Sequence, residues 1–211
     1  MRRPVNPAAG WHLLEELQGT LPDHSLGHLD AAFNGDLAAA ERLTFAAPNE
    51  FRGDIALAAY LLGVPNPAYR AIIDSVWNHD HWRLLNTVGD RRRIRRMFRA
   101  AEFSVPLAGK VLIYRGGARQ PRSRVERGLA WTTSRDVACW FATQWVNADL
   151  PDQVVLAATI DAGEIVYYSN ERYEHEVVTK CRPQSIAVDP DPGSWVAAAE
   201  RLVREREISR G

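Results

Sequence analysis

The chain has 211 residues, of which 46% are hydrophobic and 25% charged, a composition typical of a globular protein with one domain or two small ones. Its 26 basic and 26 acidic side chains cancel, so any attraction to nucleic acid or to a membrane has to come from a local cluster. With two cysteines and no apolar run typical of a signal peptide or membrane span, we expect a reduced, cytoplasmic setting without a membrane partner.

The first half of the chain has the hydrophobic period of α-helices. A short amphipathic helix is predicted over residues 11–17, and helical periodicity runs from residue 26 to about residue 65. A further helix follows Pro67 and is expected to bury Ile72, Ile73, Val76 and Trp77. The polar junction 78–82 contains His79 and His81, but a third ligand at a recognisable zinc spacing is missing. We therefore predict no metal site, and interpret these histidines as capping and packing residues.

Residues 91–99 carry six arginines, the densest charge in the chain. Ile94, Met97, Phe98 and Ala101 recur at helical spacing, so one face of this segment is expected to be core and the arginines to occupy the other faces. One interpretation, which we favour, is a solvated helix face paired with acidic residues elsewhere. The other is a patch that follows the phosphates of a nucleic acid.

After a linker at residues 104–110 the hydrophobic period changes from helical to strand-like. The sequence thus predicts a helical N-terminal region, 1–104, packed on a second domain, 105–211, with a mixed and mostly antiparallel β core, an α+β organisation. A polar loop is expected at 117–127. Strands are predicted at 111–115, 129–133, 154–160, 164–168, 174–179 and 185–189, with helices at 134–147 and from Ser194 onward.

Three polar pieces lie at the ends of predicted strands in the second domain. In chain order they are Tyr114-Arg115-Gly116, Thr132-Thr133-Ser134 and Glu174-His175-Glu176. Side chains two apart on a strand share a face, so Glu174 and Glu176 are expected to point the same way. The chain has neither a GxGxxG nor a Walker-type loop, but a strand-end guanidinium such as Arg115 can bind a pyrophosphate.

This set of pieces resembles the mono-ADP-ribosyltransferase family, in its arginine–serine–glutamate branch, over about the C-terminal half. That branch has an aromatic-Arg-Gly strand, a Ser-Thr-Ser strand followed by a helix, and a Glu-x-Glu strand. The first serine of the triplet is Thr132 here, which keeps the hydroxyl. The resemblance implies a split two-sheet β core with NAD in the cleft between the sheets, and the activity of a toxin or phage-related effector, with an antitoxin as a candidate partner.

The resemblance also implies a role for each piece. Glu176 would stabilise positive charge on the ribose of NAD, Thr132 would orient Glu176, and Glu174 would orient or deprotonate the incoming nucleophile. The cofactor-binding set would be Tyr114, Arg115, Gly116, Thr133 and Ser134, with Arg115 on the pyrophosphate and the Gly116 main chain on the nicotinamide amide. In the family the loop before the catalytic strand recognises the target, which here points to Tyr167, Tyr168 and Tyr173. The alternative is that these three are ordinary aromatic residues of the strands.

Several acceptors for the ADP-ribose stay open at this point. Glu-x-Glu goes with arginine acceptors in the family, so Glu174 favours a protein arginine, with a DNA or RNA base and water as the alternatives. A hypothesis from another class is a non-enzymatic module that binds nucleic acid through residues 91–99 and the four arginines between 119 and 127.

Overall fold

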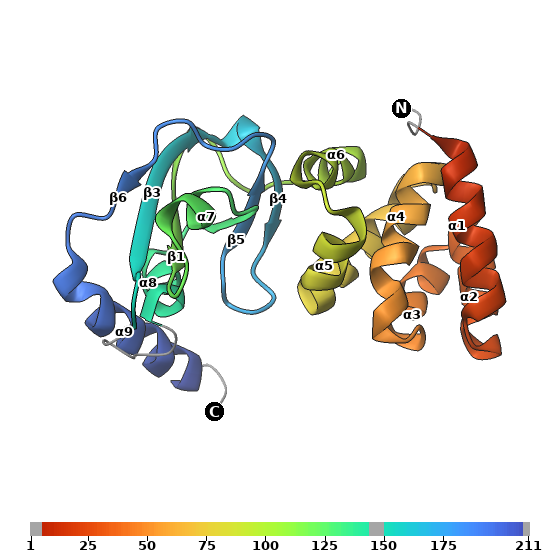
Figure 1. Cartoon of the computed structure of the whole chain (residues 1–211), viewed down its shortest axis with the longest axis horizontal. Helices are drawn as coiled ribbons and strands as arrows, with labels where there is room; N and C mark the ends of the chain where they lie inside the picture. The colour runs from red at the N-terminus through yellow and green to blue at the C-terminus, as the bar shows by residue number, and fades with distance from the viewer. Residues whose placement is uncertain (1–5, 144–149, 209–211) are drawn as a thin grey trace. The chain divides into compact units, whose positions relative to one another are not determined.

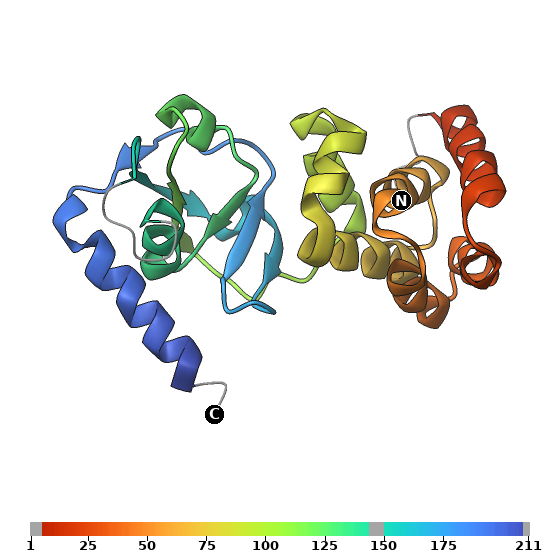
Figure 2. The same ribbon diagram turned by 60° about the horizontal axis from the view of Figure 1, so that its bottom comes forward.

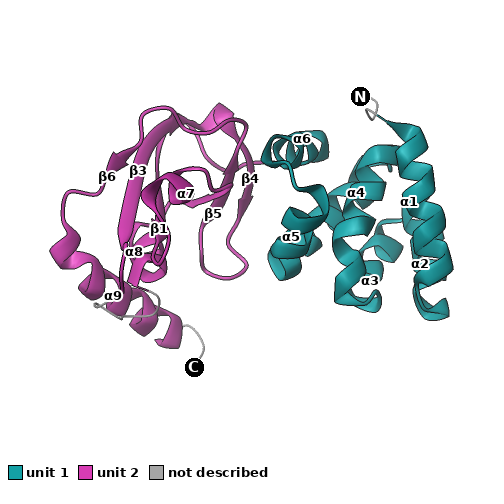
Figure 3. Cartoon of the chain, in the orientation of Figure 1, with its two compact units in different colours: residues 1–103 teal, residues 104–211 magenta. Residues whose placement is uncertain are grey.

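The computed structural model describes residues 6–143 and 150–208 (Figure 1). The chain divides into two compact units, residues 1–103 and residues 104–211, so the boundary lies one residue from the expected one (Figure 3). Among the described residues, unit 1 contains helices only, and every strand belongs to unit 2. The α+β class expected from the sequence is confirmed.

Unit 1 is built from helices joined by short turns (Figure 2). They are α1 (Pro7–Thr20), α2 (Asp23–Phe33), α3 (Leu37–Ala46), a 3-10 turn (Asn49–Phe51), α4 (Arg52–Leu62), α5 (Asn66–Val88) and α6 (Arg91–Ala101). The Asp36 carboxylate accepts the Ala39 N–H at 3.0 Å and caps α3. Gly63 and Gly89 end α4 and α5 with φ of 68° and 64°, a conformation that favours glycine.

Close packing of α4 against α5 forms the centre of unit 1. A Cβ atom at Gly53 would lie 2.8 Å from the carbonyl oxygen of Arg83, so the absent side chain lets the two helices approach. The predicted burial of Ile72, Ile73, Val76 and Trp77 on α5 is confirmed. α5 breaks at Asp80, within the predicted polar junction, where φ is −142° and the carboxylate accepts a 2.5 Å hydrogen bond from Arg52.

Unit 2 contains a six-stranded sheet in the order β4-β5-β2-β1-β3-β6, with every neighbouring pair antiparallel. The strands are β1 (Lys110–Gly117), β2 (Ala130–Thr132), β3 (Val154–Asp161), β4 (Ile165–Ser169), β5 (Glu176–Thr179) and β6 (Ala187–Val188). The helices are α7 (Arg122–Glu126), α8 (Arg135–Thr143) and α9 (Trp195–Ile208), and two 3-10 turns cover Ala162–Glu164 and Pro192–Ser194. The end of the predicted helix 134–147 lies outside the described residues.

The two-sheet core expected from the sequence differs from the observed sheet, which is continuous in its hydrogen bonding. The two halves, β4-β5-β2 and β1-β3-β6, meet through a single register pair, Tyr114 with Thr132, whereas β1 and β3 pair over eight residues. The junction is narrow because β2 is only three residues long. A weak seam therefore replaces the expected gap between two sheets.

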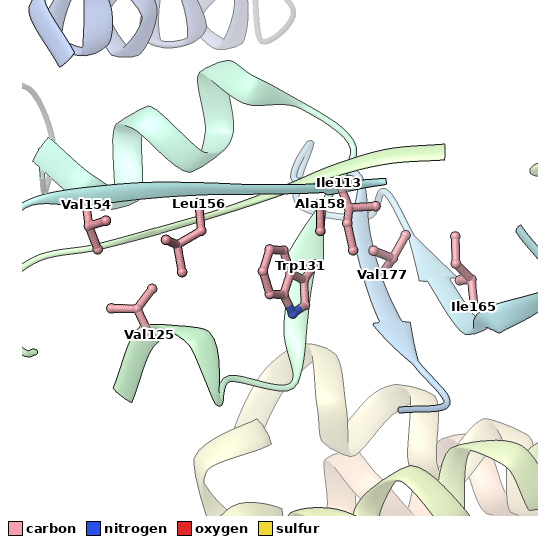
Figure 4. Close-up of a cluster of buried hydrophobic side chains, with 8 residues drawn as sticks. All are labelled: Ile113, Val125, Trp131, Val154, Leu156, Ala158, Ile165 and Val177. Atoms are coloured by element: carbon pink, nitrogen blue, oxygen red, sulfur yellow. The ribbon is translucent and has the colours of Figure 1, made fainter. Parts of the chain in front are cut away.

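The two faces of the sheet carry separate apolar clusters. Figure 4 shows one cluster on the α7 side, with Trp131 at its centre, and α8 on the opposite side of the sheet. Its members are Ile113, Val125, Trp131, Val154, Leu156, Ala158, Ile165 and Val177. The other cluster joins α8, α9 and the sheet through Cys139, Val155 and Trp195. Alternate residues along each strand thus point to opposite faces of the sheet, one set towards α7 and the other towards α8.

Two local expectations are wrong. The predicted polar loop 117–127 contains the helix α7, whose Val125 is fully buried against the sheet. Glu174 lies before β5 rather than in it, because Tyr173 and His175 have φ of 56° and 45° and the strand begins at Glu176. The alternation argument that put both glutamates on one strand face therefore does not apply.

Candidate functional site

A row of side chains crosses the sheet at the seam and joins the three polar pieces. Tyr114 on β1 lies opposite Thr132 on β2, and Thr132 lies opposite Glu176 on β5. Ser169 on β4 continues the row beyond Glu176. Directly opposed residues of antiparallel strands point to the same face, with Cβ atoms about 5 Å apart. Residues as far apart in the sequence as Tyr114 and Glu176 therefore lie on one face of the sheet.

This face is the one covered by α8. Glu176 precedes Val177, and Val177 belongs to the cluster on the α7 side, so the two side chains point to opposite faces. Glu176 is a buried carboxylate, with 7% of its surface exposed. A buried carboxylate is costly unless it is paired or hydrogen-bonded, which makes its partners decisive.

Arg172 brings Glu174 and Glu176 together. Its Nη2 atom lies 3.1 Å from a carboxylate oxygen of Glu174 and 3.1 Å from one of Glu176. The two oxygens can therefore be no further apart than the sum of these distances. The expected proximity of the two glutamates is found, although it arises from a shared cation and a turn rather than from strand alternation.

The segment that presents the glutamates is tightly turned. Tyr173 donates its N–H to the Asn170 carbonyl at 3.0 Å, and the Asn170 side chain accepts the His175 N–H at 3.2 Å. The Tyr168 hydroxyl lies 3.1 Å from Nδ1 of His175. Positive φ costs a residue other than glycine roughly 1–2 kcal/mol, and both Tyr173 and His175 adopt it. Such strain accumulates at functional sites, where the surrounding contacts maintain it.

The Thr132-Thr133-Ser134 piece holds this turned segment in place. The Thr132 hydroxyl donates to the Glu174 carbonyl at 2.6 Å and accepts the Ser134 N–H at 3.0 Å. The Thr133 N–H donates to the His175 carbonyl at 3.0 Å. We expected Thr132 to orient the Glu176 carboxylate. In the structure its hydroxyl instead donates to the main-chain carbonyl of Glu174, two residues before Glu176. Thr132 therefore positions Glu176 through the backbone.

Ser134 directly precedes α8, and its hydroxyl oxygen accepts the Val137 N–H at 3.3 Å. This contact is that of an N-cap residue. Thr133 and Ser134 were expected to bind the cofactor, and the contacts they make here are within the protein.

Arg115 lies on the other face of the sheet. It alternates with Tyr114 on β1, its Nη1 donates to the Ala130 carbonyl, and its guanidinium packs where a Cβ atom of Gly128 would be. Arg115 was expected to bind the pyrophosphate of the NAD on which Glu176 acts, and the register puts the two residues on opposite faces of the sheet.

Gly116 lies on the α8 face, but α8 already covers it. A Cβ atom at Gly116 would lie 1.7 Å from the Ala138 carbonyl oxygen. Its missing side chain serves helix packing rather than the approach of a nicotinamide ring. Its main chain pairs with Val155 in the sheet.

The sequence reasoning assigned no role to two arginines near the glutamates, Arg172 and Arg206. Arg172 contacts both carboxylates. Arg206 on α9 donates to the carbonyls of Arg172 and Tyr173 at 3.3 Å each, and its guanidinium stacks over the Trp140 ring at 4.8 Å. Arg172 lies only two residues before Glu174, and this short interval could have indicated that it contacts the glutamates. Arg206 and Trp140 belong to distant segments, and no local sequence pattern predicts that they come together.

An ion pair next to Tyr114 fixes α8 to the end of the sheet. Arg135 binds both carboxylate oxygens of Asp189 at 2.7 Å, and Trp195 donates to Asp189 at 3.0 Å. The hydrogen bond from Arg135 lowers the pKa of Asp189 to about 2, although desolvation opposes it. Burial raises the pKa of the Tyr114 hydroxyl, and Arg135 opposes that rise.

Cys139 is a buried free thiol. Burial raises the pKa of Cys139 to about 11. The thiol is therefore protonated at neutral pH and is not a candidate nucleophile.

Only one of the three tyrosines expected to recognise a target is well exposed. Tyr167 is 1% exposed and belongs to the core, and Tyr168 is half-buried against His175. Tyr173 is 46% exposed at the tip of the turned segment. Tyr173 is therefore the member of this set that a partner can contact without rearrangement.

Comparison with protein-family models, with curated proteins and with solved structures gave no match. Within residues 6–143 and 150–208, no group of three or more His, Cys, Asp or Glu side chains could hold a metal ion. The described helices include none that is long and apolar enough to cross a membrane. The histidines of the polar junction contact neighbouring residues, as expected: His79 bonds the Ser75 carbonyl at 2.9 Å and lies edge-on to Phe45, and the His81 ring lies against Trp77.

Proposed function

We propose that the protein is an NAD-dependent mono-ADP-ribosyltransferase that transfers ADP-ribose to a macromolecular acceptor, with a protein arginine as the favoured acceptor. The observation that carries the proposal is the row Tyr114, Thr132 and Glu176, which brings one residue of each motif onto one sheet face. The row supports the proposal because the resemblance assigns all three pieces to one NAD site, although Arg115 itself points to the other face of the sheet. A toxin or effector role, with an antitoxin as partner, belongs to the same proposal.

The proposed chemistry uses the two carboxylates in different roles. The bond between the ribose C1′ and the nicotinamide nitrogen breaks, and its electron pair leaves with the nicotinamide. Glu176 stabilises the positive charge that develops on the ribose, as carboxylates do in glycoside hydrolysis. The acceptor nucleophile then forms the new bond to C1′, and Glu174 takes the proton that the nucleophile loses.

The residues present suit an anionic substrate, though not through the cation first expected. Arg115 points away from Glu176, whereas Arg172 contacts both glutamates and Arg206 contacts the Arg172 carbonyl. Guanidinium groups bind phosphate bidentately and keep their charge at any physiological pH. We therefore assign binding of the pyrophosphate to Arg172 and Arg206. Arg172 would exchange its carboxylate contacts for phosphate contacts when NAD enters.

The test is the fate of NAD labelled in its adenylate part, incubated with the purified protein and a cell lysate. We expect the label on protein, and expect Glu176→Gln to abolish the transfer. The matched control is Glu164→Gln, because Glu164 is exposed and belongs to the same half of unit 2. Label on nucleic acid, or free ADP-ribose alone, would replace the arginine acceptor by a base or by water. Equal labelling by wild type and Glu176→Gln would overturn the proposal.

A further inference from the structure

We propose that the arginine face of α6 is a docking surface for double-helical nucleic acid. We define this face by its exposed residues, Arg91, Arg92, Arg93, Arg96 and Arg99. The inference concerns unit 1 and does not rest on the NAD chemistry proposed for unit 2.

The geometry of α6 separates charge from apolar surface. Ile94, Met97 and Phe98 are fully buried, so they fix one side of the helix against unit 1. Arg92, Arg96 and Arg99 follow at i, i+4 and i+7 and form a column on the exposed side. At a rise of about 1.5 Å per residue, this column extends roughly 10 Å, enough to contact several phosphates of one strand.

Unit 1 holds this helix firmly from its buried side. The Tyr69 hydroxyl donates to the Met97 carbonyl at 3.0 Å, and Arg70 donates to the Ala101 carbonyl at 3.0 Å. The rings of Trp77 and Phe98 meet edge to face at 4.9 Å. Asp90 caps the first turn by accepting the Arg92 N–H at 2.8 Å. The arginine column is therefore carried by a helix anchored at both ends and along its core side.

The arginine face lowers the stability of the α6 helix when no partner is bound. Arginines four apart repel one another, as Arg92 and Arg96 do. Arg91, Arg92 and Arg93 occupy the first turn, where the helix dipole disfavours cations. Local choices that oppose stability in this way are expected at functional surfaces.

Within the described part of unit 1, few acidic side chains neutralise the arginine face. Among the described residues, the ion pairs of this face comprise only Arg96 with Asp90, at 3.9 Å and about half exposed. Six of the twelve arginines of residues 1–103 lie between residues 91 and 99. The sequence analysis favoured a face paired with acidic side chains. In the described residues such a pair is found for one arginine of the face, Arg96.

The chemistry of the face favours a duplex over other anionic partners. Proteins that bind single strands stack the bases on aromatic side chains, and the exposed positions of α6 from Arg91 to Ala101 carry no aromatic residue. Helices that bind membranes insert their apolar side, which in α6 is buried within unit 1. A duplex offers phosphates at a fixed and close spacing, which suits a rigid row of guanidinium groups.

The test uses the full chain with fluorescent 20-bp DNA and RNA duplexes and a 20-nt single strand, with fluorescence anisotropy measured between 50 and 200 mM salt. We expect Arg92→Gln with Arg99→Gln to weaken duplex binding at least tenfold at 100 mM salt. The slope of log K against log salt should become shallower by nearly two, since each lost phosphate contact contributes about 0.9. The DNA and RNA arms identify the type of duplex.

The matched control is Arg42→Gln with Arg204→Gln, which removes the same charge from exposed positions on α3 and α9. We expect this control to bind like wild type, and expect Glu176→Gln to bind like wild type as well. Circular dichroism checks that each variant is folded. Absence of duplex binding at 50 mM salt, equal weakening by the control, or preference for the single strand would overturn the proposal. The proposal would also be overturned if Arg92 and Arg99 were needed for binding to anionic vesicles or acidic peptides but not for binding to duplexes.

Discussion

Arg172 places one guanidinium nitrogen 3.1 Å from the carboxylate of Glu176, whose side chain is only 9% exposed. We predict energetic coupling between the two residues in a double-mutant cycle with Arg172→Gln and Glu176→Gln. Loss of the cation should destabilise wild type more than it destabilises Glu176→Gln, with a coupling of about 0.5–2 kcal/mol because Arg172 is partly exposed. Urea unfolding measures the four stabilities, and strict additivity would show that the contact does not hold the site together.

Gly116 should be intolerant of any side chain. We predict that Gly116→Ala destabilises the protein by more than about 3 kcal/mol or prevents folding, because its Cβ atom would collide with the main chain of α8. The control is Gly163→Ala, since a Cβ atom at Gly163 would meet nothing within 4 Å. Thermal melting compares the two variants. A folded Gly116→Ala protein of normal stability would contradict the packing role of Gly116.

The ion pair of Arg135 with Asp189 should make stability depend on acid pH. The pKa of Asp189 is lowered from 3.8 to about 2, so its stabilising charge is complete above pH 4 and is lost as the pH falls towards 2. We predict that Asp189→Asn costs several kcal/mol at pH 7, and that the deficit shrinks by about 2 kcal/mol between pH 5 and pH 2.

Unfolding of wild type and Asp189→Asn at several pH values measures this deficit. The control is Asp161→Asn, because Asp161 pairs with Lys110 in an exposed contact and should cost less than about 1 kcal/mol. A deficit for Asp189→Asn that stays constant, or grows, towards low pH would contradict the assignment.

Tyr173 combines exposure with a positive φ of 56°. We predict that Tyr173→Asn stabilises the protein by about 0.5–1 kcal/mol, since asparagine adopts this conformation more readily than tyrosine. The control is Tyr173→Val, whose branched side chain should destabilise the turn. Chemical denaturation ranks the three proteins, and a ranking with asparagine below valine would show that the turn is not strained at this residue.

Much of the fold follows from local sequence patterns. The helical period of the first half, the buried face of α5 and the positions of most strands were predicted because burial imposes a period of 3.6 or 2 on the sequence. The three polar pieces were also predicted to lie at strand ends, because each of them adjoins an apolar strand-like segment. These features depend on neighbouring residues only.

The arrangement of the site depends on information that local patterns do not contain. Whether Arg115 faces Glu176 is decided by the register of β1 against β2, and a shift of one residue would reverse it. Strand alternation was expected to put Glu174 and Glu176 on one face. It does not apply because His175 adopts a positive φ, which the strand-like sequence pattern does not predict. Arg206 reaches the site from α9, through tertiary packing alone.

The most direct measurement of the central claim is nicotinamide release from NAD by purified protein, with cell lysate as the acceptor source. Wild type, Glu176→Gln and Glu164→Gln are compared after circular dichroism confirms that each is folded. We predict that wild type and Glu164→Gln release nicotinamide at equal rates, and that Glu176→Gln is slower by at least about a hundredfold because the developing positive charge on the ribose loses its carboxylate. Release by Glu176→Gln at the wild-type rate, or no release by wild type, would contradict the account.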